Sequence, residues 1–89
     1  MNISYGLRFS KDLDAIHNEQ NVRKKLLSII NQIKETDSLK KLAGVRKIEG
    51  YSDYFRIKLG DYRLGFKYKN NKIELLRFLH RKDIYRRFP

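Results

Sequence analysis

An alternation of apolar and cationic residues between Tyr54 and Lys67 restricts the fold of this chain more than any other feature of its sequence. Successive side chains of a β-strand point to opposite faces, so the alternation predicts two strands with one apolar face and one positively charged face. Gly60 and Asp61 separate the two strands, and glycine at the first central position favours a two-residue type II′ turn. The stretch is therefore predicted to form an antiparallel hairpin whose apolar face needs a covering layer.

A two-residue turn determines which residues of this hairpin lie opposite each other. The predicted pairs on the apolar face are Leu59 with Tyr62, Ile57 with Leu64 and Phe55 with Phe66. The predicted pairs on the charged face are Lys58 with Arg63, Arg56 with Gly65 and Tyr54 with Lys67. Two cations directly opposite each other repel. Either this face binds a polyanion, or Lys58 and Arg63 extend into solvent as part of an ordinary outer face. The charge pattern leaves both interpretations open.

The first half of the chain is predicted to supply the covering layer. Residues Asn2 to Phe9 alternate and predict a strand, after which Ser10 is predicted to be the N-cap of a short helix. A second helix is expected from Glu19 to Lys34, because apolar residues recur there at helical spacing. The stripe that they form consists of Val22, Leu26, Ile29, Ile30 and Ile33. We expect both helices to pack on the apolar face of the sheet.

A second hairpin is predicted at Asn70–Asn71, since asparagine tolerates left-handed backbone conformations. A two-residue loop there pairs Lys67 with Glu74 but places Arg77 on the apolar face. A loop longer by one residue moves Arg77 to the charged face, and the sequence leaves both registers open. The following strand, Ile73–Leu79, is apolar on both faces, which predicts a central strand with the N-terminal strand as its other neighbour.

These elements predict an α+β fold. Two N-terminal helices pack on one face of a small, mainly antiparallel four-stranded sheet, in the order strand, helix, helix and three strands. A short basic tail, whose conformation is left open, follows from His80 to Pro89. The length of 89 residues predicts a single domain over residues 1–89.

The charge balance indicates the kind of partner. Lys and Arg total 21 against 10 Asp and Glu, a net charge of +11 that favours a nucleic acid or an acidic protein as partner. The chain has no cysteine, no apolar run of about 20 residues and no signal-peptide pattern. We therefore expect a cytoplasmic protein without disulfides, membrane contact, bound metal or small-molecule cofactor.

The chemistry-bearing residues are Arg, Lys and Tyr, with one His, near the ends of neighbouring strands. Arginine forms bidentate hydrogen bonds with phosphate, and tyrosine stacks on unpaired bases, so this set suits a phosphodiester substrate. RNA carries its own nucleophile, the 2′-hydroxyl, and a protein need only orient it, transfer protons and stabilise the developing charge. A metal-free ribonuclease is thus chemically possible, and binding without cleavage is equally compatible with these residue types.

The segments YFRIKLGDYRLGF and LLRFLHRKDIYRRF, together with the predicted order of elements, resemble the RelE/ParE superfamily of bacterial toxins. The resemblance spans nearly the whole chain. It implies a RelE-like fold and a toxin that cleaves mRNA in the A site of the ribosome. It also implies an acidic antitoxin, encoded beside the toxin, that blocks this activity.

The resemblance also implies roles for individual residues. The catalytic candidates are Lys58, Arg63, Arg81 and Tyr85. The substrate-binding candidates are Arg56, His80, Lys82, Arg86 and Arg87. By resemblance, Lys58 and Tyr85 transfer protons, whereas Arg63 and Arg81 stabilise the phosphate in the transition state. His80 is either an acid–base group or a structural residue at the end of a strand.

Two other functions remain open from the sequence. One is a ParE-like protein that poisons DNA gyrase by protein–protein contact, which needs no cluster of Arg, Lys and Tyr. The other is a catalytically silent module that binds RNA or an antitoxin. Substitution of Arg63 or Arg81 by alanine is expected to separate these classes.

Overall fold

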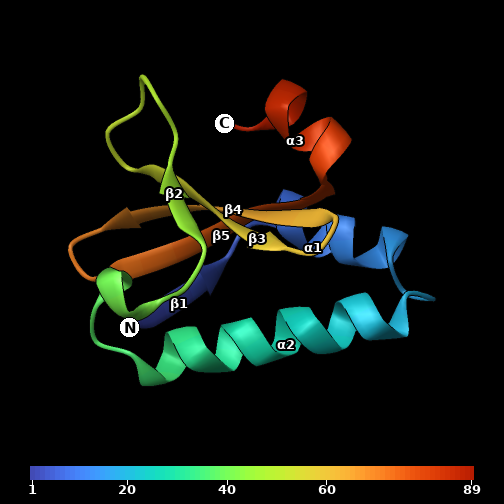
Figure 1. The fold of residues 1–89 in the computed structure, drawn as a ribbon, viewed down its shortest axis with the longest axis horizontal. Coiled ribbons are helices and arrows are strands. Elements are labelled where there is room, and N and C mark those ends of the chain that lie inside the picture. Colours follow the sequence, from blue (N-terminus) through green and yellow to red (C-terminus); the bar gives the residue numbers. More distant parts are fainter.

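A computed structural model describes residues 1–89 as one five-stranded sheet with helices on both of its faces (Figure 1). The elements are β1 (Asn2–Tyr5), α1 (Leu7–Ala15), α2 (Gln20–Glu35), the 3₁₀ turn η1 (Leu39–Lys41), β2 (Val45–Lys47), β3 (Tyr54–Leu59), β4 (Tyr62–Lys69), β5 (Lys72–His80) and α3 (Arg81–Arg87). The strand order is β1-β5-β4-β3-β2, with β1 parallel to β5 and every other pair antiparallel. The α+β class is confirmed, but the sheet has five strands rather than four, because β2 pairs with the outer edge of β3.

The β3–β4 hairpin has the predicted register. Each of the six predicted pairs is present, including Lys58 opposite Arg63 on the charged face. Gly60 has a φ of +58°, while Asp61 is not among the residues with positive φ, as a type II′ turn requires. The alternation of residue types was therefore sufficient to predict which side chains share each face.

The β4–β5 hairpin turns at Asn70 and Asn71, whose φ angles are 53° and 60°. Two consecutive residues with positive φ are typical of a type I′ turn, which joins strands with a two-residue loop. Lys67 lies opposite Glu74, so the shorter of the two predicted loops is the correct one.

Arg77 nevertheless lies on the charged face, opposite Gly65, because β5 contains a β-bulge. Gly65 pairs with Arg77, whereas the next residue of β4, Phe66, pairs with Leu75, so Leu76 is extra. An extra residue exchanges the faces of everything beyond it. The bulge within β5 thus moves Arg77 to the charged face, as a loop longer by one residue was predicted to do.

The predicted boundary between the first strand and the first helix was wrong. The strand ends at Tyr5 and α1 begins at Leu7, with Gly6 rather than Ser10 as N-cap. The Gly6 N–H donates to the carbonyl of Leu75 at 2.8 Å, and a Cβ at Gly6 would lie 3.0 Å from that oxygen. The apolar residues beyond this contact follow helical rather than strand spacing: Phe9, Leu13 and Ile16.

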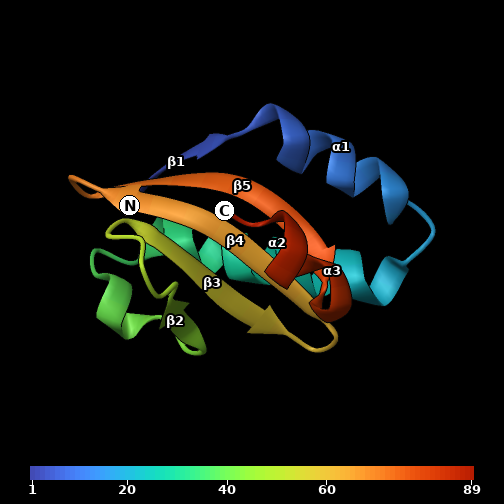
Figure 2. The same cartoon turned by 90° about the horizontal axis from the view of Figure 1, so that it is seen from above.

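The two N-terminal helices occupy different positions. Helix α2 covers one face of the sheet, and its predicted apolar stripe joins the main core. Helix α1 lies beside β5 at the edge of the sheet, beyond the end of β1 (Figure 2). Its apolar residues Phe9 and Leu13 nevertheless contribute to the same core as α2. The carboxylate of Asp12 accepts the Phe78 N–H at 2.9 Å and two bonds from the Arg77 guanidinium at 2.9 and 3.0 Å. Asp12 thus supplies a hydrogen-bond acceptor for a backbone N–H at the edge of β5, beyond the last residue that pairs with β1.

The C-terminal tail forms helix α3 on the face of the sheet opposite α2 (Figure 1). A second, smaller apolar cluster of Leu79, Ile84 and Phe88 holds it there, with Ile48, Tyr54 and Leu76 packed around it. The Phe88 ring lies directly on Gly65, where a Cβ would come within 2.8 Å of the ring. The outer face of the sheet is therefore partly covered by the tail, and its cations gather beside α3.

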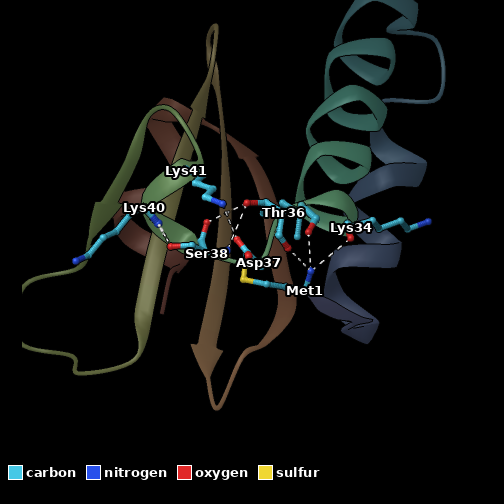
Figure 3. A network of polar contacts seen from close by, with 8 residues as sticks. Met1, Lys34, Thr36, Asp37, Ser38, Lys40 and Lys41 are labelled. Atoms are coloured by element: carbon cyan, nitrogen blue, oxygen red, sulfur yellow. Dashed lines mark hydrogen bonds and ion pairs between the residues drawn. The ribbon is translucent and has the colours of Figure 1, made fainter.

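A polar network closes the end of α2 (Figure 3). The ammonium of Met1 donates to the carbonyls of Ile33 at 3.0 Å and Thr36 at 2.6 Å, and a positive charge is favourable at the C-terminus of a helix. Beside it, the hydrogen bond and charge of Lys41 lower the pKa of Asp37. None of the helices combines the length and apolar character that a membrane crossing requires.

Candidate functional site

The cations of the first hairpin stand on the outer face of the sheet. Arg56 and Lys58 alternate along β3 with residues that enter the core, and Lys58 is exposed opposite Arg63 of β4. The chain forms three ion pairs, and none of them involves these three cations. The repulsion between Lys58 and Arg63 is thus not offset by a carboxylate of the same chain.

Part of the Arg63 guanidinium is already bound to the hairpin turn. Its Nη1 donates to the carbonyl of Gly60 at 2.8 Å and to that of Tyr62 at 2.9 Å. A guanidinium has five N–H donors, so the Nε–H and both hydrogens of Nη2 are left without a partner in the chain. The Nε–H and one hydrogen of Nη2 form an edge of the guanidinium that can bind two oxygens of a phosphate.

Helix α3 brings two more predicted residues to the same face. The backbone N–H of Arg81 donates to the carbonyl of Asp61 at 2.7 Å, so the helix begins at the turn of the β3–β4 hairpin. Arg81 and Tyr85 are four residues apart and lie on one side of the helix. The Cζ atom of Arg56 lies 4.8 Å from the centre of the Tyr85 ring, a cation–π contact that joins β3 to α3.

His80 has contacts that favour the structural one of its two predicted roles. Its Nδ1 accepts the N–H of Lys82 at 3.2 Å and caps α3, and its ring meets that of Tyr62 edge-on at 5.6 Å. An accepting Nδ1 requires the neutral tautomer with the proton on Nε2. His80 thus helps to set the direction in which α3 leaves the sheet.

The remaining predicted residues lie along the exposed side of α3. Lys82 donates its backbone N–H to His80, and Arg86 pairs with Asp83 at 2.9 Å. Arg87 lines a separate polar hollow between α1 and α3. Its other lining residues are Arg8, Lys11, Asp12, Arg77 and Arg86. The structure therefore separates Arg87 from the contact between Arg56 and Tyr85.

An open groove of about 850 Å³ adjoins this contact, between α3 and the segment that contains β2. It is lined by Arg46, Lys47, Ile48, Glu49, Tyr51, Arg56, Tyr85, Arg86, Phe88 and Pro89. Arg46, Lys47 and Tyr51 are not among the residues that the sequence predicted for the site. Arg46 lies opposite Arg56 because β2 pairs with β3. A prediction of this pairing from the sequence would have placed Arg46 and Lys47 beside Arg56.

Comparison with protein families and curated proteins places the chain among toxins. Residues 3–85 match a family model described as the ParE toxin of the type II toxin–antitoxin system parDE. The chain is 38% identical to Toxin RelE3 of Methanocaldococcus jannaschii over 90 residues, which covers 100% of both proteins.

Solved structures of similar fold include toxins bound to antitoxins. The RelB–RelE antitoxin–toxin complex of Methanococcus jannaschii matches with a TM-score of 0.80 at 36% identity, over 96% of this chain and 98% of that one. YafQ of Escherichia coli matches with a TM-score of 0.76 at 18% identity, over 94% and 97%. YoeB, in its complex with YefM from Staphylococcus aureus, has a TM-score of 0.71 at 17% identity, over 90% and 95%. At these lower identities, YafQ and YoeB support the fold alone.

Proposed function

Because this chain belongs to the ParE toxin family of type II toxin–antitoxin systems, within the RelE/ParE superfamily, we propose that it is a ribosome-dependent endoribonuclease. In this proposal it cleaves mRNA in the A site of the ribosome, in the cytoplasm, and thereby inhibits translation. A cognate acidic antitoxin neutralises it. The observation that carries the proposal is the meeting of Arg56 on the hairpin with Tyr85 on α3, beside the unpaired cations Lys58 and Arg63.

The proposed reaction uses the 2′-hydroxyl of the RNA as nucleophile. Its oxygen attacks the adjacent phosphorus, the bond from phosphorus to the 5′-oxygen breaks, and a 2′,3′-cyclic phosphate and a 5′-hydroxyl result. One group must take the proton from the 2′-hydroxyl and another must give a proton to the leaving oxygen. Lys58 and Tyr85 are our candidates for these two transfers, in an order that the geometry leaves open.

Two arginines are our candidates for charge stabilisation. The phosphorane that forms during the attack carries more negative charge on its oxygens than the substrate does, so cations fixed nearby lower the barrier. The free edge of Arg63 and the side chain of Arg81 supply such charges from the two sides of the hairpin turn. Arg56 is proposed to bind substrate, with further electrostatic attraction from Lys82, Arg86 and Arg87. His80 is proposed to contribute to binding through its free Nε2–H donor.

The openness of the site gives the ribosome a role. The candidate side chains lie on an exposed face, and Tyr85 is 67% exposed, so the protein alone holds an RNA strand only loosely. Attack by the 2′-hydroxyl requires it to be in line with the leaving oxygen, and orientation of this kind is a large part of catalysis. We propose that the ribosome supplies it by holding the mRNA against this face.

The net positive charge of the chain and the solved complex of a relative support an acidic antitoxin as its partner. The M. jannaschii relative was solved with its antitoxin, and a net charge of +11 attracts an acidic chain. We expect the antitoxin to wrap the toxin and to cover or distort its basic face.

The match to the ParE model favours poisoning of DNA gyrase as the second candidate. Contact with gyrase does not require the hairpin and α3 cations to converge. The two candidates therefore predict different effects when Arg63 or Arg81 is removed.

The test is primer extension on a translated reporter mRNA with the purified protein, for the wild type, Arg63→Ala and Arg81→Ala. We expect cuts within A-site codons that require ribosomes and that decline by at least about a hundredfold in each variant. Growth arrest with DNA damage and without cuts would overturn the proposal in favour of gyrase. The absence of both cuts and growth arrest would indicate a silent binding module. Lys40→Ala, which removes an exposed lysine of the turn η1 outside the candidate site, is the control that should cleave like the wild type.

A further inference from the structure

Three aromatic residues, Tyr51, Tyr85 and Phe88, line the groove beside the candidate site, and Tyr54 contacts two of them. The Tyr54 ring lies between two others, edge-on to Tyr51 at 5.8 Å and 82° and edge-on to Phe88 at 5.8 Å and 88°. Ile48 packs beside them in the smaller apolar cluster. The lining therefore includes an apolar, aromatic part that opens to solvent.

The rim of the same groove is cationic. Arg46 and Arg56 are opposite each other on β2 and β3, and Lys47 follows on β2. Arg86 lines the other side, where it already pairs with Asp83. Glu49 is the one acidic side chain in the lining, so positive charge predominates.

Tyr51 is presented by a fixed loop. The Ile48 N–H donates to the Tyr54 carbonyl at 2.9 Å, and the Tyr51 N–H donates to the Ile48 carbonyl at 3.3 Å. Gly50 has a φ of +82°, in the left-handed region that favours glycine, and allows the turn between them. Tyr51 is nonetheless 48% exposed, so a well-held ring keeps much of its surface free.

We propose that this groove binds one unpaired nucleotide of the RNA strand that runs past the candidate catalytic residues. The base stacks on Tyr51, and Arg46 and Lys47 contact its phosphate. The proposal rests on the proposed function, because Arg56 and Tyr85 belong both to the groove and to the candidate site. It adds a subsite from β2 and the loop that follows it.

The chemistry of the groove favours a nucleotide over an acidic peptide. Carboxylates would need only the cations, whereas a nucleotide uses both the aromatic faces and the cations, since every base has a π-face. Two of the three exposed tyrosine rings, Tyr51 and Tyr85, line the same groove as the cations. A groove of this composition binds single strands with little preference for base identity.

The test is binding of a short single-stranded RNA oligonucleotide to the full chain, compared with an oligonucleotide of equal length whose ribose units carry no bases. We expect Tyr51→Ala to weaken binding of the RNA by at least about fivefold, the low end for one base–aromatic stack, and Tyr51→Phe to retain it. Binding of the abasic strand should be equal in all three proteins. Tyr5→Ala, which removes another exposed tyrosine at 49%, is the control for the loss of a ring outside the groove.

Equal binding of the RNA by wild type and Tyr51→Ala would overturn the proposal. So would unchanged RNA binding together with weaker neutralisation by the antitoxin, which would assign the groove to the antitoxin. Thermal unfolding of each variant shows whether Tyr51→Ala is folded. Tyr51→Leu, which keeps apolar volume but has no aromatic face, replaces it if it is not. Because binding is measured without cleavage, failure here is distinct from failure of Arg63→Ala to abolish cleavage.

Discussion

At the scale of single residues, similar side chains have different roles that depend on their partners. Arg77 and Arg63 are both half-buried arginines of the outer face, yet Arg77 forms two hydrogen bonds with Asp12 while Arg63 bonds only to backbone carbonyls. Separating a guanidinium from a largely buried carboxylate would leave an uncompensated charge, so Arg77 has little freedom to bind a ligand. Arg63 keeps a free edge, so it is the better candidate for a phosphate contact.

His80 provides a test at this scale. Its imidazole caps α3, and replacement of an N-cap by alanine costs about 1 kcal/mol. We expect His80→Ala to lower the free energy of unfolding by about that amount, and His80→Asn, which restores an N-cap acceptor, to recover both stability and cleavage. Urea denaturation and the reporter assay measure the two effects. If His80→Asn is stable but does not cleave, His80 is an acid–base group and the structural interpretation fails.

At the scale of elements, the site depends on how α3 is held. Arg81 and Tyr85 belong to a helix of seven residues that has little stability by itself. The cluster of Leu79, Ile84 and Phe88 fixes it to the sheet. Gly65 makes this possible, because the Phe88 ring occupies the space that any larger residue would need.

We therefore expect Gly65→Ala to displace α3 without unfolding the main core. The added Cβ would lie 2.8 Å from the Phe88 ring, and overpacking of this kind costs about 1–3 kcal/mol. Hydrogen exchange should accelerate in α3 while α2 and β5 remain protected, and cleavage should fall as far as in Arg81→Ala.

Phe88→Ala serves as the companion variant. It removes the anchor without adding volume, so it should release α3 in the same way. Slow exchange in α3 of both variants, with cleavage retained, would contradict the role given to this contact.

At the scale of the whole molecule, charge decides how the protein meets its partners. The net charge of +11 is spread over the chain, but Arg56, Lys58, Arg63 and Arg81 gather at one end of the outer face beside α3. Contacts with phosphates release counterions, so the affinity falls steeply as salt rises.

We expect binding of the protein to ribosomes to weaken by at least about a hundredfold between about 50 and 200 mM salt. Arg56→Ala with Lys58→Ala should reduce the slope of log affinity against log salt by about 2, one for each phosphate contact. Lys34→Ala with Lys40→Ala removes two exposed lysines from elsewhere on the surface and should leave the slope unchanged. Sedimentation with ribosomes over a salt series measures this, and a nearly flat affinity would exclude a basic face that binds RNA.

The sequence by itself determined the first hairpin, its register, the long helix and the two faces of the sheet. These features depend on residues that are close in the chain, where a turn of two residues and a period of 2 or 3.6 leave few alternatives. The same alternation placed Arg56, Lys58 and Arg63 together on one face, as the structure has them.

Only the tertiary structure decided the features that depend on distant residues. The start of α1 follows from a bond between Gly6 and Leu75, and the face of Arg77 follows from a bulge that brings it to Asp12. The helical form of the tail depends on Phe88 packing against Gly65, and the groove at Tyr51 depends on the pairing of β2 with β3. These contacts join residues that are far apart in the chain, and they override local propensities. Local patterns of residues therefore do not predict them.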